Sequence, residues 1–128
     1  MPLTAFAALL LMANGPVVVV SPSSEQEFEI GFDELVAGDN AAAIAEIEAG
    51  TVLAVDDPAR LINHAVAHAR AGEYDAARAK LEFAARYADR YELETADGNW
   101  VDSRVLARHG IALLDQGEFD RYVALAQR

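Results

Sequence analysis

The chain has 128 residues, of which 53% are hydrophobic and 24% charged, and its formal net charge is −11. This length and composition are those of one globular domain and exclude an intrinsically disordered chain. There is no cysteine, which excludes disulfides, thiolate catalysis and cysteine-ligated metal sites.

The negative charge is concentrated in the first half of the chain. Ten Asp and Glu residues and no Lys or Arg precede Arg60, whereas the remainder has ten basic residues and eleven acids. An acidic half repels nucleic-acid phosphates and anionic lipids, so we expect no nucleic-acid partner. It is compatible with a basic protein surface, although a solvated helical face is the simpler explanation for the acids.

Residues 1–23 are predicted to be a signal peptide or apolar leader with a Pro/Ser linker. The apolar run Leu3–Ala13 has the length of a signal-peptide core and is too short for a stable membrane span. Asn14-Gly15-Pro16 interrupts it before Val17–Val20. We therefore expect export to the periplasm or cell envelope, with a cytoplasmic location as the alternative.

Two further interpretations of the leader stay open, because it lacks a basic start and an Ala-x-Ala cleavage site. In the first, the segment packs on the domain as an extra helix or strand. In the second, the start codon was wrongly chosen and a basic leader was cut off.

The first predicted helical hairpin covers about residues 24–50. Ser24-Glu25-Gln26-Glu27 has the pattern of a capping box, which predicts a helix to about Ala37. Gly38 ends that helix, and Asp39 or Asn40 caps a second helix that runs to about Ala49.

The second and third predicted hairpins cover about 57–90 and 102–127. Asp57-Pro58 supplies an N-cap acid and a proline at the first helical position, and Asp102 or Ser103 can cap the third hairpin. An insertion of about 91–101 separates the two hairpins, with a tight turn at Asp97-Gly98-Asn99. The nearby aromatic side chains are expected to fill the gap between the hairpins; they are Tyr87, Tyr91 and Trp100.

In each of the three predicted hairpins, one glycine ends the first helix. Gly38 and Gly72 are 34 residues apart, which is the period of a tetratricopeptide repeat, and Gly117 follows after the insertion. A small residue lies seven positions before each glycine: Gly31, Ala65 and Gly110. Over about residues 24–128 the chain resembles the tetratricopeptide repeat (TPR) family.

This resemblance implies an all-α fold: a short right-handed solenoid of about three helical hairpins, preceded by the apolar N-terminal segment. The aromatic residue usual in the first TPR helix and the repeat-ending proline are missing or displaced. Sel1-like and HEAT-like hairpins therefore remain alternatives.

The resemblance also implies a concave groove that binds a partner segment. An asparagine just before the middle of the first TPR helix often faces this groove, and Asn63 occupies that position. Its amide can donate to and accept from an extended peptide backbone. The same register gives the other candidate partner-binding residues: Phe28, Phe32, Ile62, Val66, Arg70, Arg104, Arg108 and Ile111.

These assignments have simpler alternatives. The arginines would grip a carboxylate of the partner, or else pair within the chain with Asp102, Asp115 or Glu94. Asn63 would otherwise be a solvated surface residue.

His64 and His68 are the candidate metal ligands. Four residues apart on one helix, they share a face. A metalloprotease motif would need Glu after the first histidine, and Ala65 stands there instead. A third ligand would come from His109 or a carboxylate, and packing between helices is the simpler interpretation of the pair.

The predicted function is a protein–protein interaction or scaffold module that binds a protein or peptide segment in the groove, without a cofactor or enzymatic activity. The alternative is a metal- or small-ligand-binding envelope protein that uses His64 and His68. Since the last hairpin has no polar capping helix, Tyr122, Val123 and Leu125 are either exposed or covered. This C-terminal hairpin is the expected surface for self-association.

Overall fold

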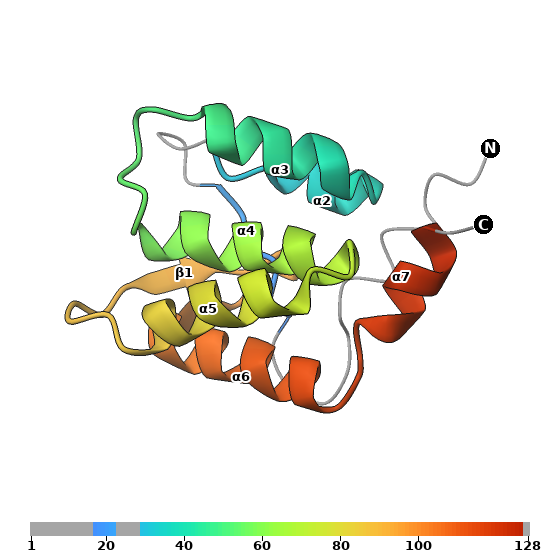
Figure 1. The fold of residues 1–128 in the computed structure, drawn as a ribbon. Helices are drawn as coiled ribbons and strands as arrows, with labels where there is room; N and C mark the ends of the chain where they lie inside the picture. Colours follow the sequence, from blue (N-terminus) through green and yellow to red (C-terminus); the bar gives the residue numbers. More distant parts are fainter. Residues whose placement is uncertain (1–16, 23–28, 127–128) are drawn as a thin grey trace.

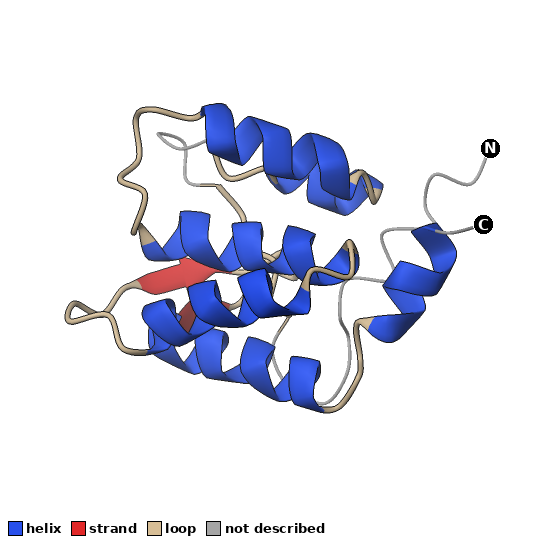
Figure 2. Cartoon of the chain, viewed as in Figure 1, coloured by secondary structure: helices blue, strands red, loops and turns tan. Residues whose placement is uncertain are grey.

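In the computed structural model of the chain, residues 17–22 and 29–126 are described. They form six helices and one two-stranded sheet (Figure 1). The elements are α2 (Phe32–Ala37), α3 (Asn40–Ala49), α4 (Pro58–Arg70), α5 (Tyr74–Ala85), β1 (Glu92–Glu94), β2 (Trp100–Asp102), α6 (Ser103–Asp115) and α7 (Asp120–Ala126). The described part is mostly helical (Figure 2), as predicted, and the small sheet was not predicted.

Three helices begin at the predicted acidic caps. The carboxylate of Asp39 accepts from the N–H of Ala42 at 3.0 Å, and that of Asp57 accepts from the N–H of Ala59 at 3.0 Å. At α6 it is Asp102, whose carboxylate accepts from the N–H of Arg104 at 2.8 Å. Each acid satisfies amide groups that have no partner within the helix.

The three repeat glycines adopt the same backbone conformation. Gly38, Gly72 and Gly117 have φ angles of 81°, 86° and 71°, in the left-handed region that side chains with a Cβ avoid. Gly38 and Gly72 close the turns after α2 and α4, and Gly117 follows α6. The glycine spacing thus corresponds to three helix ends, while the right-handed solenoid itself stays a prediction.

The first predicted helix was placed too early. Residues 29–31 are not helical, and α2 begins at Phe32 after a left-handed Gly31 with φ 63°. The carbonyl of Ile30 accepts instead from the side chain of Asn63 at 2.9 Å. A Cβ at Gly31 would lie 3.2 Å from the carbonyl oxygen of Ala43, so glycine allows this turn to approach α3. The predicted capping box lies outside the described residues.

Helix α4 is the centre of the domain. It contacts α2, α3, α5, α6 and α7, and every one of its residues except His64 is buried. Helices α3, α4, α5 and α6 lie side by side in chain order (Figure 1). Helices α5 and α6 approach closely at Gly110, where an added Cβ would lie 3.0 Å from a methyl group of Leu81.

The predicted insertion forms a β-hairpin. Strands β1 and β2 pair antiparallel, with Leu93 opposite Val101, and Gly98 in the connecting turn has φ 85°. The predicted tight turn is confirmed. The prediction that the aromatic residues fill a gap is wrong for Trp100 and Tyr91, which are 63% and 45% exposed. Side chains alternate along a strand, and here Leu93 and Val101 face the core.

Of the apolar residues in the C-terminal hairpin that were predicted to be either exposed or covered, one is covered and another is exposed. Tyr122 is buried against α4, where the guanidinium of Arg70 lies 4.9 Å from its ring centroid. Leu125, by contrast, is 40% exposed. Self-association through this end stays a prediction. Over residues 17–22 and 29–126, none of the helices has the length and apolar character needed to cross a bilayer.

Candidate functional site

An extended segment of the chain, residues 17–22, crosses the face of α4 that carries Asn63 (Figure 1). Its four consecutive valines, Val17–Val20, are each at most 1% exposed and belong to the main hydrophobic core. A strand covered on both faces is typically such an unbroken apolar run. Residues 17–22 thus pack on the domain in extended form, and the rest of the predicted leader lies outside the described residues.

One edge of the 17–22 segment pairs with the β-hairpin. The N–H of Ser21 donates to the carbonyl of Glu94 at 2.8 Å, and the N–H of Ala96 donates to the carbonyl of Val19 at 2.9 Å. These two bonds enclose an antiparallel bridge between Val20 and Thr95. The segment is thus joined to the end of β1 by one isolated bridge, outside the two-stranded sheet.

The other edge is satisfied by a single side chain. The amide of Asn63 accepts from the N–H of Val20 at 2.7 Å and donates to the carbonyl of Val20 at 2.8 Å. Asn63 is completely buried. Its side chain therefore takes the place of a neighbouring strand, because one amide offers both a donor and an acceptor.

The predicted function of the Asn63 amide, a two-way hydrogen bond to an extended backbone, thus occurs within the chain itself. The solvated alternative for Asn63 is wrong, since the side chain is buried and fully engaged. Binding of an external partner by this amide stays a prediction.

The other apolar candidates lie in or near the same core. Val66 is 1% exposed and Ile62 is fully buried, both in the core that contains Val17–Val20. Phe32 and Ile111 are partly buried and pack against this core. Phe28 lies outside the described residues.

The candidate arginines are not brought together. Arg70 is 2% exposed, and its guanidinium donates to the carbonyl of Leu35 at 2.7 Å. Arg104 donates to the carbonyl of Ala88, and Arg108 is exposed on α6. The predicted intrachain acids take other partners: Asp102 lies 3.9 Å from Arg90, and Asp115 lies 2.5 Å from Arg78.

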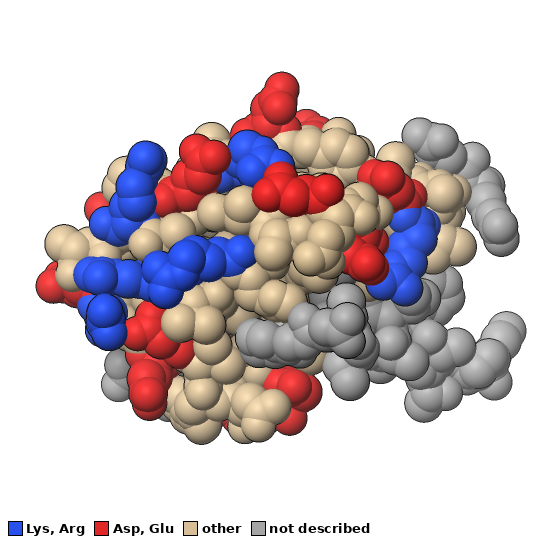
Figure 3. All heavy atoms as spheres, turned by 90° about the horizontal axis from the view of Figure 1, so that it is seen from below, with Lys and Arg blue, Asp and Glu red and all other residues tan. Residues whose placement is uncertain are grey.

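Seen from below in Figure 3, basic side chains form a band that acidic side chains flank. On this face of the molecule, side chains of both charge signs are therefore present together. A partner carboxylate would therefore meet a mixed field here rather than a uniformly positive one.

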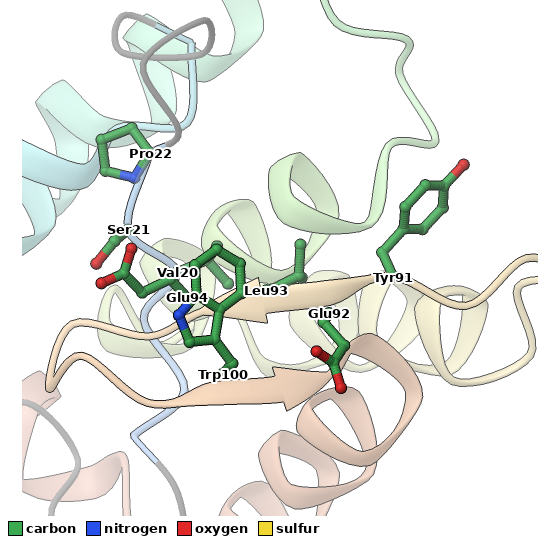
Figure 4. A pocket seen from close by; sticks show the side chains of 8 residues that line it. All are labelled: Val20, Ser21, Pro22, Tyr91, Glu92, Leu93, Glu94 and Trp100. Atoms are coloured by element: carbon green, nitrogen blue, oxygen red, sulfur yellow. The ribbon is translucent and has the colours of Figure 1, made fainter.

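A pocket lies beside the 17–22 segment, where Val20, Ser21 and Pro22 meet β1 and β2 (Figure 4). Exposed aromatic side chains of Tyr91 and Trp100 are among its lining residues. The pocket thus brings solvent-exposed apolar surface to the end of the segment. It is formed by pieces of chain more than 60 residues apart, which sequence analysis did not connect.

The two histidines stack on α4, with ring centroids 4.4 Å apart. Nε2 of His64 lies 3.2 Å from a carboxylate oxygen of Glu48, and Nδ1 of His68 lies 3.1 Å from one of Glu73. Burial, together with the charges of His68 and Lys80, lowers the pKa of His64 to about 4. His64 is therefore neutral at pH 7. Of the two predicted sources of a third ligand, the carboxylate is the one brought to the histidines, by Glu48, whereas His109, on α6, is not part of this cluster.

The first hairpin carries two acids that share a hydrogen bond. The Glu34 carboxyl raises the pKa of Glu46 to about 7, and partial burial and the charge of Asp33 act in the same direction. A carboxyl whose pKa is raised on folding stabilises the fold below its unfolded value, about 4.5, and that contribution is lost as pH rises through 7.

We therefore expect Glu46→Gln to be more stable than the parent chain at pH 8, and the difference to vanish at pH 5. Both carboxyls are partly solvated, so the gain at pH 8 is at most about 1 kcal/mol, or about 4 °C in melting temperature. His64 has the opposite pH dependence, because its contribution to stability is lost as pH falls from about 6.5 to about 4. His64 is present in both chains, so its contribution cancels in the variant-minus-parent difference.

The measurement is therefore the variant-minus-parent difference in melting temperature from pH 5 to 8. A difference that stays constant over this range would contradict the prediction for Glu46.

No family model, no curated protein and no solved structure matches this chain. The TPR-like assignment accordingly stays a prediction from glycine spacing and hairpin order.

Proposed function

We propose that this chain is a protein-interaction module that binds an extended segment of a partner protein along the face of α4 around Asn63. The 17–22 segment occupies this face in the free chain and has to be displaced by the partner. Affinity comes from burial of apolar side chains, and Asn63 fixes the direction and register of the bound backbone.

The observation that carries the proposal is the pair of hydrogen bonds between the Asn63 amide and Val20. Both involve only main-chain groups of Val20, so they would form equally with another residue of an extended peptide. The side chains that flank this amide are apolar and buried, such as Ile62 and Val66. The partner segment is therefore expected to be rich in β-branched residues, like the valines it replaces.

Because the 17–22 segment occupies the binding face, the apparent affinity for a partner peptide depends on how firmly this segment is held. When the binding face is open in only a small fraction of molecules, the apparent dissociation constant equals the intrinsic constant divided by that fraction, so binding is weaker. Weakening the segment by about 1.4 kcal/mol should therefore improve apparent affinity for an external peptide about tenfold.

The experiment uses a fluorescent peptide with the sequence of residues 15–24, titrated into the full chain and followed by anisotropy. We expect weak binding to the parent chain and at least tenfold tighter binding to Val19→Ala, which loses buried methyl groups from the competing segment. The same change at the exposed Val55 is the control and should leave the affinity unchanged.

A second variant tests the assigned contact. Asn63→Ser in the Val19→Ala background should weaken peptide binding, because the shorter hydroxyl side chain cannot bond both main-chain groups. Far-UV circular dichroism checks that the variant is folded. Saturable binding that Val19→Ala does not improve would contradict the proposal.

A further inference from the structure

His64 and His68 are joined by a third group with metal-ligand chemistry from another helix. Glu48, at the end of α3, approaches the two histidines of α4, and one ligand atom from each residue lies within 4.8 Å of the others. Two helices that are neighbours in the stack thus converge on one point. Among the described residues, this cluster combines imidazole and carboxylate groups, which is a common ligand set for Zn²⁺.

The separations are close to those that one ion needs. Zinc holds nitrogen and oxygen ligands at about 2.0–2.2 Å, which in a tetrahedral site places the ligand atoms about 3.4 Å apart. Nε2 of His64 and the near oxygen of Glu48 are already 3.2 Å apart. The Glu48 side chain is 56% exposed and can close the remaining distance by a change of rotamer.

A second carboxylate orients one of the histidines. Glu73 lies 3.1 Å from Nδ1 of His68 and outside the three-ligand cluster. When Nδ1 donates its proton to this carboxylate, Nε2 becomes the unprotonated nitrogen and can ligate a metal. Histidines that bind zinc commonly have such a carboxylate partner, which fixes the tautomer and strengthens the ligand.

The charges around the site offset one another. The ammonium of Lys80 acts on His64 and opposes a cation. Glu48 and Glu73 each lie against one of the imidazoles and supply two negative charges. The local field therefore favours a divalent ion.

We propose that Glu48, His64 and His68 bind one divalent transition-metal ion of the Zn²⁺ type, with the fourth position open to water or to a ligand from a partner. Two imidazoles favour Zn²⁺ over Mg²⁺ and Ca²⁺, which prefer sites made only of oxygen ligands. The ion would join α3 to α4 and stabilise their packing. This site does not use Asn63 or the 17–22 segment, so it is independent of the proposed peptide binding.

The test is isothermal titration calorimetry of ZnCl₂ into the tag-free full chain after treatment with a chelator. We expect one ion per chain, and at least tenfold weaker binding to Glu48→Gln. Glu48 is largely exposed, so this variant keeps the fold and its shape while losing the ligand charge. Glu82→Gln, an exposed acid of α5 outside the cluster, is the matched control and should bind like the parent chain.

Two further measurements separate this site from general binding of cations by an acidic protein. A hundredfold excess of Mg²⁺ or Ca²⁺ should not displace the Zn²⁺, and His68→Gln should lose binding whereas His109→Gln should not. Equal loss of affinity in Glu48→Gln and Glu82→Gln would overturn the proposal. Displacement by Mg²⁺, or unchanged binding to Glu48→Gln, would overturn it as well.

Discussion

Replacing Val19 with aspartate is expected to lower the free energy of unfolding by about 4 kcal/mol or more, which is a large part of the 5–15 kcal/mol typical of a domain. Val19 is completely buried within the 17–22 segment. The change removes about 1.5–3 kcal/mol of apolar burial and places a carboxylate where water cannot reach it. Urea unfolding followed by circular dichroism measures the effect as a lower midpoint concentration.

The same substitution at an exposed valine provides the control. Val55 is 76% exposed, in the connection between α3 and α4, so Val55→Asp should change stability by at most about 0.5 kcal/mol. The contrast separates burial from the general effect of one more negative charge on an acidic chain. Equal unfolding midpoints for the two variants would show that the 17–22 segment contributes nothing to the core.

Asn63→Ala is expected to destabilise the chain by about 3–5 kcal/mol. The change leaves three buried main-chain groups without their partner: the N–H and carbonyl of Val20 and the carbonyl of Ile30. An unpaired buried polar group costs about 1–3 kcal/mol, and alanine also leaves a cavity. The unfolding midpoint in urea measures this loss, with the slope showing whether the transition remains two-state.

The matched control is Asn40→Ala, since the side-chain oxygen of Asn40 has no hydrogen-bond partner among the described residues. Its expected effect is below about 0.5 kcal/mol. Because Asn63→Ala and Val19→Asp both release the 17–22 segment, the double variant should lose less stability than the sum of the two single changes. Strict additivity would mean that Asn63 and the valines stabilise different parts of the fold.

These two predictions bear on the predicted leader. A cleavage site near residue 23 would remove Val17–Val20, whose side chains belong to the core with those of α4. A mature chain without them would expose the α4 face around Asn63, which is the face that the proposed function assigns to a partner. Export and peptide binding would then be coupled, and N-terminal sequencing of the native protein tests the cleavage itself.

The helices were predictable because their signals are local. The acids at Asp39, Asp57 and Asp102 bond to amides two or three residues away, so the cap is visible in the sequence. The start of α2 was not predictable from such signals, because Gly31 takes a left-handed conformation to fit against α3 and the carbonyl of Ile30 bonds to Asn63.

The sequence by itself determined the caps, the three helix-ending glycines and the capacity of Asn63 to bond an extended backbone, because each depends on neighbouring residues or on the chemistry of one side chain. Only the tertiary structure decided what meets these groups. Asn63 bonds to Val20, 43 residues away, and Glu48 reaches His64, 16 residues away. No local pattern encodes such pairs; they form when the buried valines and the apolar faces of α3 and α4 pack into one core.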